Sequence, residues 1–127
     1  MKTKRNKPFL AYILALKFPM ILNDTTIMVW GDTDYTKHDL PDHLLAHEEV
    51  HIKQQKNKLL GLIWWARYVF SKKFRLKQEL EAYREQYKVS GDPKVLHQIA
   101  TDLSGKMYGN IISFDEAVKQ IKNYEKD

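Results

Sequence analysis

The chain of 127 residues has the length of one domain, and its hydrophobic content of 43% is enough to form a single packed core. Lysine and arginine number 21 against 16 acids, and the net charge of +5 favours an ordinary solvated surface, with nucleic acid or anionic lipid as less favoured partners. The chain has no cysteine, which excludes disulfides, thiolate nucleophiles and cysteine-ligated zinc and fits a cytoplasmic protein. We therefore expect one domain over residues 1–127, in which any metal is held by histidine, aspartate or glutamate.

The first residues, MKTKRNKPFLAYILAL, combine a basic start with a short apolar run, as a secretion signal does. Lys17 and Pro19 interrupt the run and no small-residue cleavage site follows at once, so a cleaved signal is not expected. Residues 9–16 fit either a short helix or a strand. From 20 to 36, β-branched and aromatic residues punctuated by ND and GD predict a hairpin or a sheet of two to three strands.

From Pro41 onward the sequence pattern becomes helical. Pro41 suits the first position of a helix, which we expect to extend to about Asn57. Further helices are expected over about 59–70, 73–89 and 93–107, and the capping box SFDE at 113–116 opens the last one.

The apolar run LLGLIWWARYVF at 59–70 is about half the length that spans a bilayer. A buried helix is therefore favoured there, with contact to a membrane surface left open. The predicted fold class is α+β, in which a small N-terminal hairpin or sheet is followed by a helical bundle.

The segment LLAHEEVHIKQQ, residues 44–55, places His47 and His51 four residues apart on an expected helix. Residues four apart lie one turn apart on the same face, so both imidazoles can point at one ion. Glu48 follows His47 directly and stands beside the pair, where it can reach a water on the metal without being a ligand. This is the HExxH arrangement of two nitrogen ligands and a carboxylate base. Leu44 shares the stripe of the two histidines, which places them on the inward side of the helix.

A third histidine, His43, lies four residues before His47 and offers a competing pair. The residues between His43 and His47 supply no base, and one helix does not easily present three rings to a single tetrahedral ion. We therefore interpret His43 as an exposed or capping histidine.

Zinc bound by two histidines needs a third protein ligand and an open position. The candidates lie in KQELEAYREQY, residues 77–87, where helical phase separates the glutamates. Glu79 falls within the apolar stripe, whereas Glu81 and Glu85 fall outside it; the stripe is made of Leu76, Leu80, Tyr83 and Tyr87.

An inward carboxylate among apolar neighbours is costly unless it is paired or binds a metal. Glu79 is therefore the favoured third ligand, and Glu81 is the runner-up. The alternative for Glu79 is a buried salt bridge, for instance with Arg67 or Arg75.

HEEVH, followed by a linking helix and then ELEAY, resembles the gluzincin branch of the zincin metallopeptidases, and most closely its minimal single-domain members. The resemblance covers about residues 26–87 and implies a zincin-like fold and a Zn²⁺ cofactor. In the family pattern the third ligand is the first glutamate of an E-x-x-A-[D/Y]-like string, which is Glu79 here. Larger relatives often carry aspartate where this chain has Tyr83, and this departure leaves the support of His47 or His51 unassigned.

The same resemblance implies a role for TTIMVWG, residues 25–31, as an exposed edge strand that pairs with an extended peptide substrate. A strand that only covers the motif helix is an equally good interpretation. On the peptidase interpretation, Glu48 is the general base toward a zinc-activated water. A further donor to the transition state is expected, and the sequence does not choose among Tyr83, Tyr87, Tyr108 and His97.

Three functions remain open from the sequence. A zinc-dependent peptidase, a hydrolase of peptide bonds in a peptide or protein substrate, is favoured by the motif and its context. A metal-binding or partner-binding module without activity is the alternative, because so small a chain has little room for a walled cleft. A basic nucleic-acid-binding protein with an accidental motif is disfavoured, since no known nucleic-acid-binding motif accompanies the charge.

Overall fold

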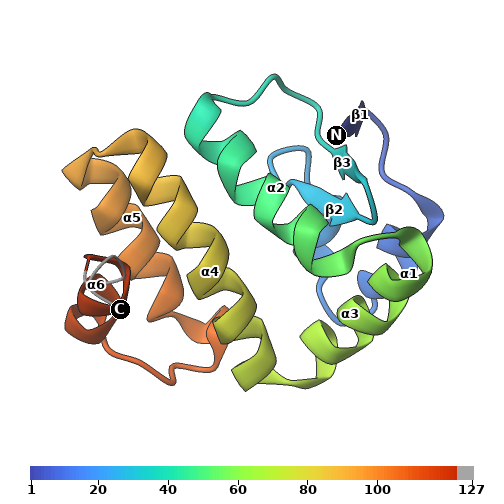
Figure 1. Ribbon diagram of the computed structural model, residues 1–127. Coiled ribbons are helices and arrows are strands. Elements are labelled where there is room, and N and C mark those ends of the chain that lie inside the picture. The colour runs from blue at the N-terminus through green and yellow to red at the C-terminus, as the bar shows by residue number, and fades with distance from the viewer. Residues whose placement is uncertain (123–127) are drawn as a thin grey trace.

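The computed structural model describes residues 1–122 and confirms an α+β fold, with a small sheet beside a group of helices (Figure 1). The predicted hairpin is formed by β2 (Met28–Trp30) and β3 (Thr33–Tyr35), which pair antiparallel. A parallel strand, β1 (Lys2–Lys4), completes the order β1-β3-β2. β1 was not predicted because its three residues are all exposed and carry no apolar alternation. The order leaves β2 at an edge of the sheet.

The helices follow the expected order. The first apolar run, which fits either a short helix or a strand in the sequence, forms helix α1 (Phe9–Leu14). Pro41 caps the helix that carries the motif and is not its first residue, because its backbone is still extended. The expected fourth helix is shorter than predicted, since α5 ends at Leu103 and a 3-10 turn, η2, follows. The remaining elements are η1 (Pro19–Leu22), α2 (Asp42–Gln55), α3 (Lys58–Phe70), α4 (Lys72–Ser90), α5 (Pro93–Leu103), η2 (Lys106–Tyr108) and α6 (Phe114–Lys122).

The core has two apolar parts, one on each side of the interface between α2 and α4. One part joins α1, the hairpin and α3 and includes Ala11, Met28 and Trp65. The other joins α4, α5 and α6 around Ile99 and Leu103. Helices α2 and α4 run side by side between the two parts, and the residues they bury against each other are largely polar (Figure 1). A functional site is therefore expected at this interface.

The apolar helix α3 was expected to be buried, and only half of it is. Trp64, Trp65 and Tyr68 are buried on one side, whereas Leu59, Ile63 and other large apolar residues on the opposite side are exposed. No helix within residues 1–122 is long and apolar enough to cross a membrane.

Candidate metal centre

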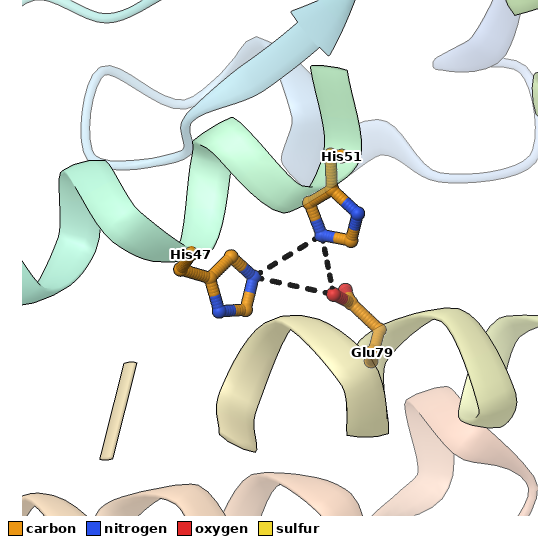
Figure 2. A group of neighbouring side chains, drawn as sticks. All are labelled: His47, His51 and Glu79. Carbon is orange, nitrogen blue, oxygen red and sulfur yellow. Dashed lines mark hydrogen bonds and ion pairs between the residues drawn. The ribbon is translucent and has the colours of Figure 1, made fainter. Parts of the chain in front are cut away.

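The predicted ligand residues converge in a buried group between α2 and α4. His47 and His51 project from consecutive turns of α2, and Glu79 faces them from α4 (Figure 2). The His47 Nε2 atom lies 3.2 Å from His51 Nε2 and 3.2 Å from Glu79 Oε1, and His51 Nε2 lies 2.6 Å from the same oxygen. All three residues are buried, and together they can hold a metal ion.

The donor set and its spacing fit a zinc-sized ion. Two imidazole nitrogens and one carboxylate oxygen are the ligands of one class of catalytic zinc site. With bonds of about 2.0–2.2 Å in tetrahedral geometry, neighbouring donor atoms lie about 3.3 Å apart. Two of the observed separations match that spacing, and the third, between His51 and Glu79, is the length of a charge-assisted hydrogen bond. A small movement of the Glu79 carboxylate away from His51 is therefore enough to admit an ion.

Neighbouring polar groups orient two of the three ligands. His51 Nδ1 contacts Gln54 Oε1 at 2.9 Å, and the amide nitrogen of Gln54 donates to the carbonyl of Gln78. These two hydrogen bonds require the proton of neutral His51 to be on Nδ1, which leaves the Nε2 lone pair for a metal. Glu79 Oε2 accepts hydrogen bonds from the hydroxyls of Tyr68 at 2.8 Å and Tyr108 at 3.0 Å. The other carboxylate oxygen, Oε1, is thereby left facing the histidines.

His47 is held differently. Its Nδ1 atom is buried and has no hydrogen-bond partner within residues 1–122. Its ring packs edge-on against Tyr83, with 4.5 Å between ring centroids. The described contact that orients His47 is therefore a ring contact.

The charges of the group depend strongly on one another. Burial alone would lower the pKa of His51, but the nearby carboxylates of Glu79 and Glu48, together with the hydrogen bonds that His51 donates to Glu79 and Gln54, raise it to about 9. Burial alone would raise the pKa of Glu79, but His51 and His47 hold it well below its usual value. Without a metal, a proton on His51 thus compensates the buried carboxylate. A divalent cation can replace that proton.

Glu48 lies in the same cavity as the three-residue group. Its side chain is buried, and it lines the same cavity as His47, His51 and Glu79, which has a volume of about 480 Å³. Burial is the largest cause that raises the pKa of Glu48, and the positive charges of His47 and His51 oppose the rise. A carboxylate whose pKa is raised toward neutrality is a better base at neutral pH.

The outer edge of β2 is partly occupied by a side chain. The amide of Gln55, fully buried at the end of α2, donates to the carbonyl of Val29 and accepts from the backbone N–H of Gly31. The indole of Trp65 donates to the same Val29 carbonyl. Gly61 on α3 makes room for this contact, because a Cβ there would lie 2.6 Å from Gln55 Oε1. The expected edge strand over 25–31 is also shorter than predicted, because β2 begins at Met28 and the backbone N–H and carbonyl of Thr26 bond to Asn23 and to the Lys7 ammonium group.

The structure sorts the remaining sequence candidates. Glu81 is exposed and takes no part in the group. The interpretation of His43 as exposed or capping is wrong, because it is half-buried and its Nδ1 contacts the amide of Gln86 at 3.1 Å. The arginines named in the salt-bridge alternative do not pair with Glu79, because Arg75 donates to the carbonyls of Tyr68 and Val69 and Arg67 lies over the ring of Phe74. The ion pairs of Glu79 are with His47 and His51.

Among the candidate donors, Tyr83 and Tyr108 line the cavity. His97 packs against Phe114 instead, with 5.2 Å between ring centroids. Tyr87 packs with the apolar cluster of α5 and α6. Only Tyr83 and Tyr108 of the four are therefore placed to act on a molecule in the cavity.

Sequence reasoning missed Tyr68, Gln54 and Gln55. Tyr68 shares the inward stripe of Trp64 and Trp65 on α3, and this spacing was the only available signal that it faces inward. Gln54 follows His51 by three residues on one helix, which is a usual spacing for side-chain contact. Nothing in the sequence pairs Gln55 with β2, because that contact joins residues that are 24 and 26 positions apart.

Comparison with known proteins adds no assignment, since no family model, curated protein or solved structure matches the chain. The function has to be inferred from the site itself.

Proposed function

We propose that this protein is a zinc-dependent metallopeptidase of the gluzincin type, with His47, His51 and Glu79 as metal ligands. The observation that carries the proposal is the buried His47, His51 and Glu79 group, with Glu48 lining the same cavity. Zinc at this site would supply Lewis-acid chemistry, lowering the pKa of water and polarising a peptide carbonyl. The chain itself supplies orientation, proton transfer and exclusion of bulk water.

In this proposal Glu48 is the general base. Its carboxylate accepts the proton of the attacking water and passes it to the nitrogen of the departing amine. Burial raises the pKa of Glu48 above its usual value, which makes the carboxylate a stronger base toward the attacking water.

Tyr83 is the proposed donor to the developing oxyanion. Burial and the negative charges of Glu79 and Asp102 raise its pKa well above the usual value, so the hydroxyl keeps its proton at neutral pH. Tyr83 lines the cavity beside His47, whereas the hydroxyl of Tyr108 is already engaged by Glu79. A retained phenolic proton beside the site is the property that an oxyanion donor needs.

The proposed substrate is an extended peptide bound along the edge of β2. Thr25, Thr26 and Ile27 line the cavity together with Glu48, so the segment just before β2 borders the site. Backbone groups of alternate residues point to the same side of a strand, so Ile27 faces the same side as Val29. Gln55 and Trp65 occupy the Val29 carbonyl, and the backbone groups of Thr26 bond to Asn23 and Lys7, so the peptide pairs with residues 27–29 rather than with all of 25–31.

The decisive experiment compares Glu48→Gln with Glu49→Gln. The two residues are adjacent on α2, but Glu48 is buried in the cavity and Glu49 is exposed. We expect Glu48→Gln to reduce hydrolysis of an unfolded protein substrate by about 10²–10⁴-fold with bound zinc unchanged, and Glu49→Gln to be as active as the wild type. Metal content is measured by elemental analysis of the same samples.

Two results would contradict this proposal. Undiminished turnover by Glu48→Gln would show that another group is the base. Stoichiometric zinc without hydrolysis of any peptide by the wild type would favour the alternative of a metal-binding module without activity.

A further inference from the structure

Two helices expose an apolar stripe where a soluble surface normally carries polar residues. On α1 and the turn after it, the stripe follows the helical spacing i, i+3, i+4, i+7 and consists of Phe9, Tyr12, Ile13 and Leu16. On α3 the same spacing gives Leu59, Leu62, Ile63 and, two turns later, Phe70. Phe9, Leu16 and Phe70 are 79%, 88% and 80% exposed. Scattered single exposed residues need no explanation, but two complete stripes do.

The two stripes belong to one surface. The buried sides of the helices share one core, in which Ala11 and Leu14 of α1 pack with Trp65 and Val69 of α3. The ammonium group of Lys17 lies 5.2 Å from the centre of the exposed Phe70 ring, which joins the ends of the two stripes. We call this surface the α1–α3 face. It lies at the end of the molecule opposite α5 and α6 (Figure 1).

The segments that carry this face contain no acid. Residues 1–23 include five lysine or arginine residues and residues 50–78 include eight, so the two segments hold 13 of the 21 basic residues and none of the 16 acids. Seven of the eight in residues 50–78 are exposed, and Arg75 is buried. The remainder of the chain, with eight basic residues and all 16 acids, is strongly acidic. The moderate net charge of +5 therefore hides a sharp separation of charge.

We propose that the α1–α3 face docks on the surface of an anionic lipid bilayer, with its apolar stripes in the interface and its basic side chains at the phosphate level. Apolar residues surrounded by lysine and arginine are the combination that binds such an interface. Lys2 and Arg5 pair with Asp32 and Asp39, but two copies of this chain would still bring the exposed Lys17, Lys58 and Arg67 of each face together, which disfavours self-association through this face. Nucleic acid would match the charge but would leave the apolar stripes without a partner.

This docking is distinct from peptide hydrolysis, but it has a spatial link to the proposed site. Phe18, Met20 and Ile21 follow the α1 stripe directly and line the cavity that contains Glu48. The face is thus continuous along the chain with part of the cavity lining.

Vesicle sedimentation tests the docking. The full-length protein is mixed with vesicles of phosphatidylcholine plus phosphatidylglycerol, or of phosphatidylcholine alone, and the bound fraction is measured. We expect strong binding to the anionic vesicles, weak binding to the neutral ones, and a loss of binding as salt is raised. Metal-free protein and the Glu48→Gln variant should bind equally well, so failure of the peptidase proposal would leave this result intact.

Two variants address the apolar and the basic parts separately. Leu16→Gln/Phe70→Gln should weaken partitioning by at least about tenfold, since burial of each large apolar side chain contributes about tenfold. Lys17→Gln should weaken binding to the anionic vesicles by about fivefold and leave binding to neutral vesicles unchanged. Val89→Gln, which changes an exposed apolar residue of α4 outside the face, is the control and should bind like the wild type.

Far-UV circular dichroism checks that the variants are folded. Absence of binding to anionic vesicles, or wild-type binding by both folded variants, would overturn the proposal. Concentration-dependent dimerisation that Leu16→Gln/Phe70→Gln abolishes, without vesicle binding, would identify a second copy as the occupant and would equally overturn it.

Discussion

The two sides of α4 use opposite chemistry. Toward α5 and α6 it presents the apolar residues Leu76, Leu80 and Tyr87, whereas toward α2 it buries Glu79 and Gln86. Apolar burial stabilises without further requirements, but a buried carboxylate beside two imidazoles is costly unless a proton or a cation compensates it. The comparison indicates that the α5–α6 side maintains the fold and that the α2 side is arranged to bind a charged ligand.

The largest effect on stability is expected on the apolar side. Leu103 has no exposed surface and packs in the α5–α6 cluster. Leu103→Ala should lower the free energy of unfolding by about 2–5 kcal/mol, equally with and without zinc, because Leu103 is not among the residues that line the cavity of the metal ligands. Urea denaturation measures this loss, and the exposed Val89→Ala serves as the control. A loss that disappears when zinc is added would show that the two sides are not separate.

Removal of zinc should lower the stability that comes from the α2 side of α4 and leave the contribution of the α5–α6 side unchanged. Zinc at 100 to 1,000 times its dissociation constant should raise the free energy of unfolding by about 3–4 kcal/mol, since it binds only the folded chain. The free energy of unfolding gained from zinc should be the same in Leu103→Ala, because the contributions of distant sites to stability are additive. Glu79→Gln should abolish it, and thermal unfolding with and without a chelator provides the measurement. A persistent increment in Glu79→Gln would mean that zinc binds elsewhere.

Loss of a single hydrogen bond to Glu79 should have a smaller effect than loss of the metal. Tyr108→Phe removes one of the two hydrogen bonds that hold Glu79 Oε2. We expect zinc affinity to fall by about 10–100-fold, the usual cost of losing an outer hydrogen bond to a ligand, with the fold unchanged. Competition with a chromophoric chelator measures the affinity. Tyr35→Phe, which changes another buried tyrosine in the other apolar cluster, should retain full affinity.

A change of pH should have the smallest effect on the stability that comes from the α2 side of α4. In the metal-free protein, the raised pKa of His51 contributes stability that is complete below its usual value of 6.5 and is lost as the pH rises through about 9. The lowered pKa of Glu79 contributes stability that is present above its usual value of 4.5 and is lost as the pH falls below it. The Tm of metal-free protein should therefore decrease between pH 6.5 and 9, and this decrease should be smaller in Glu79→Gln.

Zinc binding should show the opposite dependence on pH. A metal at His51 displaces the proton that the imidazole otherwise holds, so apparent affinity should rise as the pH increases toward 9. Titration of metal-free protein with zinc at several pH values tests this. An affinity that is independent of pH would indicate that His51 is not a ligand.

The sequence predicted the parts of the molecule that depend on local pattern. Helical periodicity placed α2, α3 and α4 close to their observed bounds, and helical phase selected Glu79 over Glu81 as the inward carboxylate. Ser113 accepts a hydrogen bond from the backbone N–H of Glu116, as the capping box predicted. These features were readable because each depends on residues within one or two helical turns.

The features that were missed depend on contacts between distant residues. β1 is defined by its pairing with β3, about 30 residues later, and not by its own exposed sequence. The support of Glu79 by Tyr68 and Tyr108 joins three elements, and periodicity within any one of them cannot reveal it. His43 was misjudged because its partner, Gln86, is 43 residues away.

Helix α3 joins the two halves of the proposed site. Trp65 donates to the Val29 carbonyl of the proposed substrate strand, and Tyr68, only three residues later, donates to the proposed ligand Glu79. Three residues correspond to about 4.5 Å along a helix, so less than one turn of α3 sets the alignment of strand and carboxylate. Damage to that turn would therefore release the strand and the carboxylate together, so zinc affinity and peptide binding should fall in the same variant.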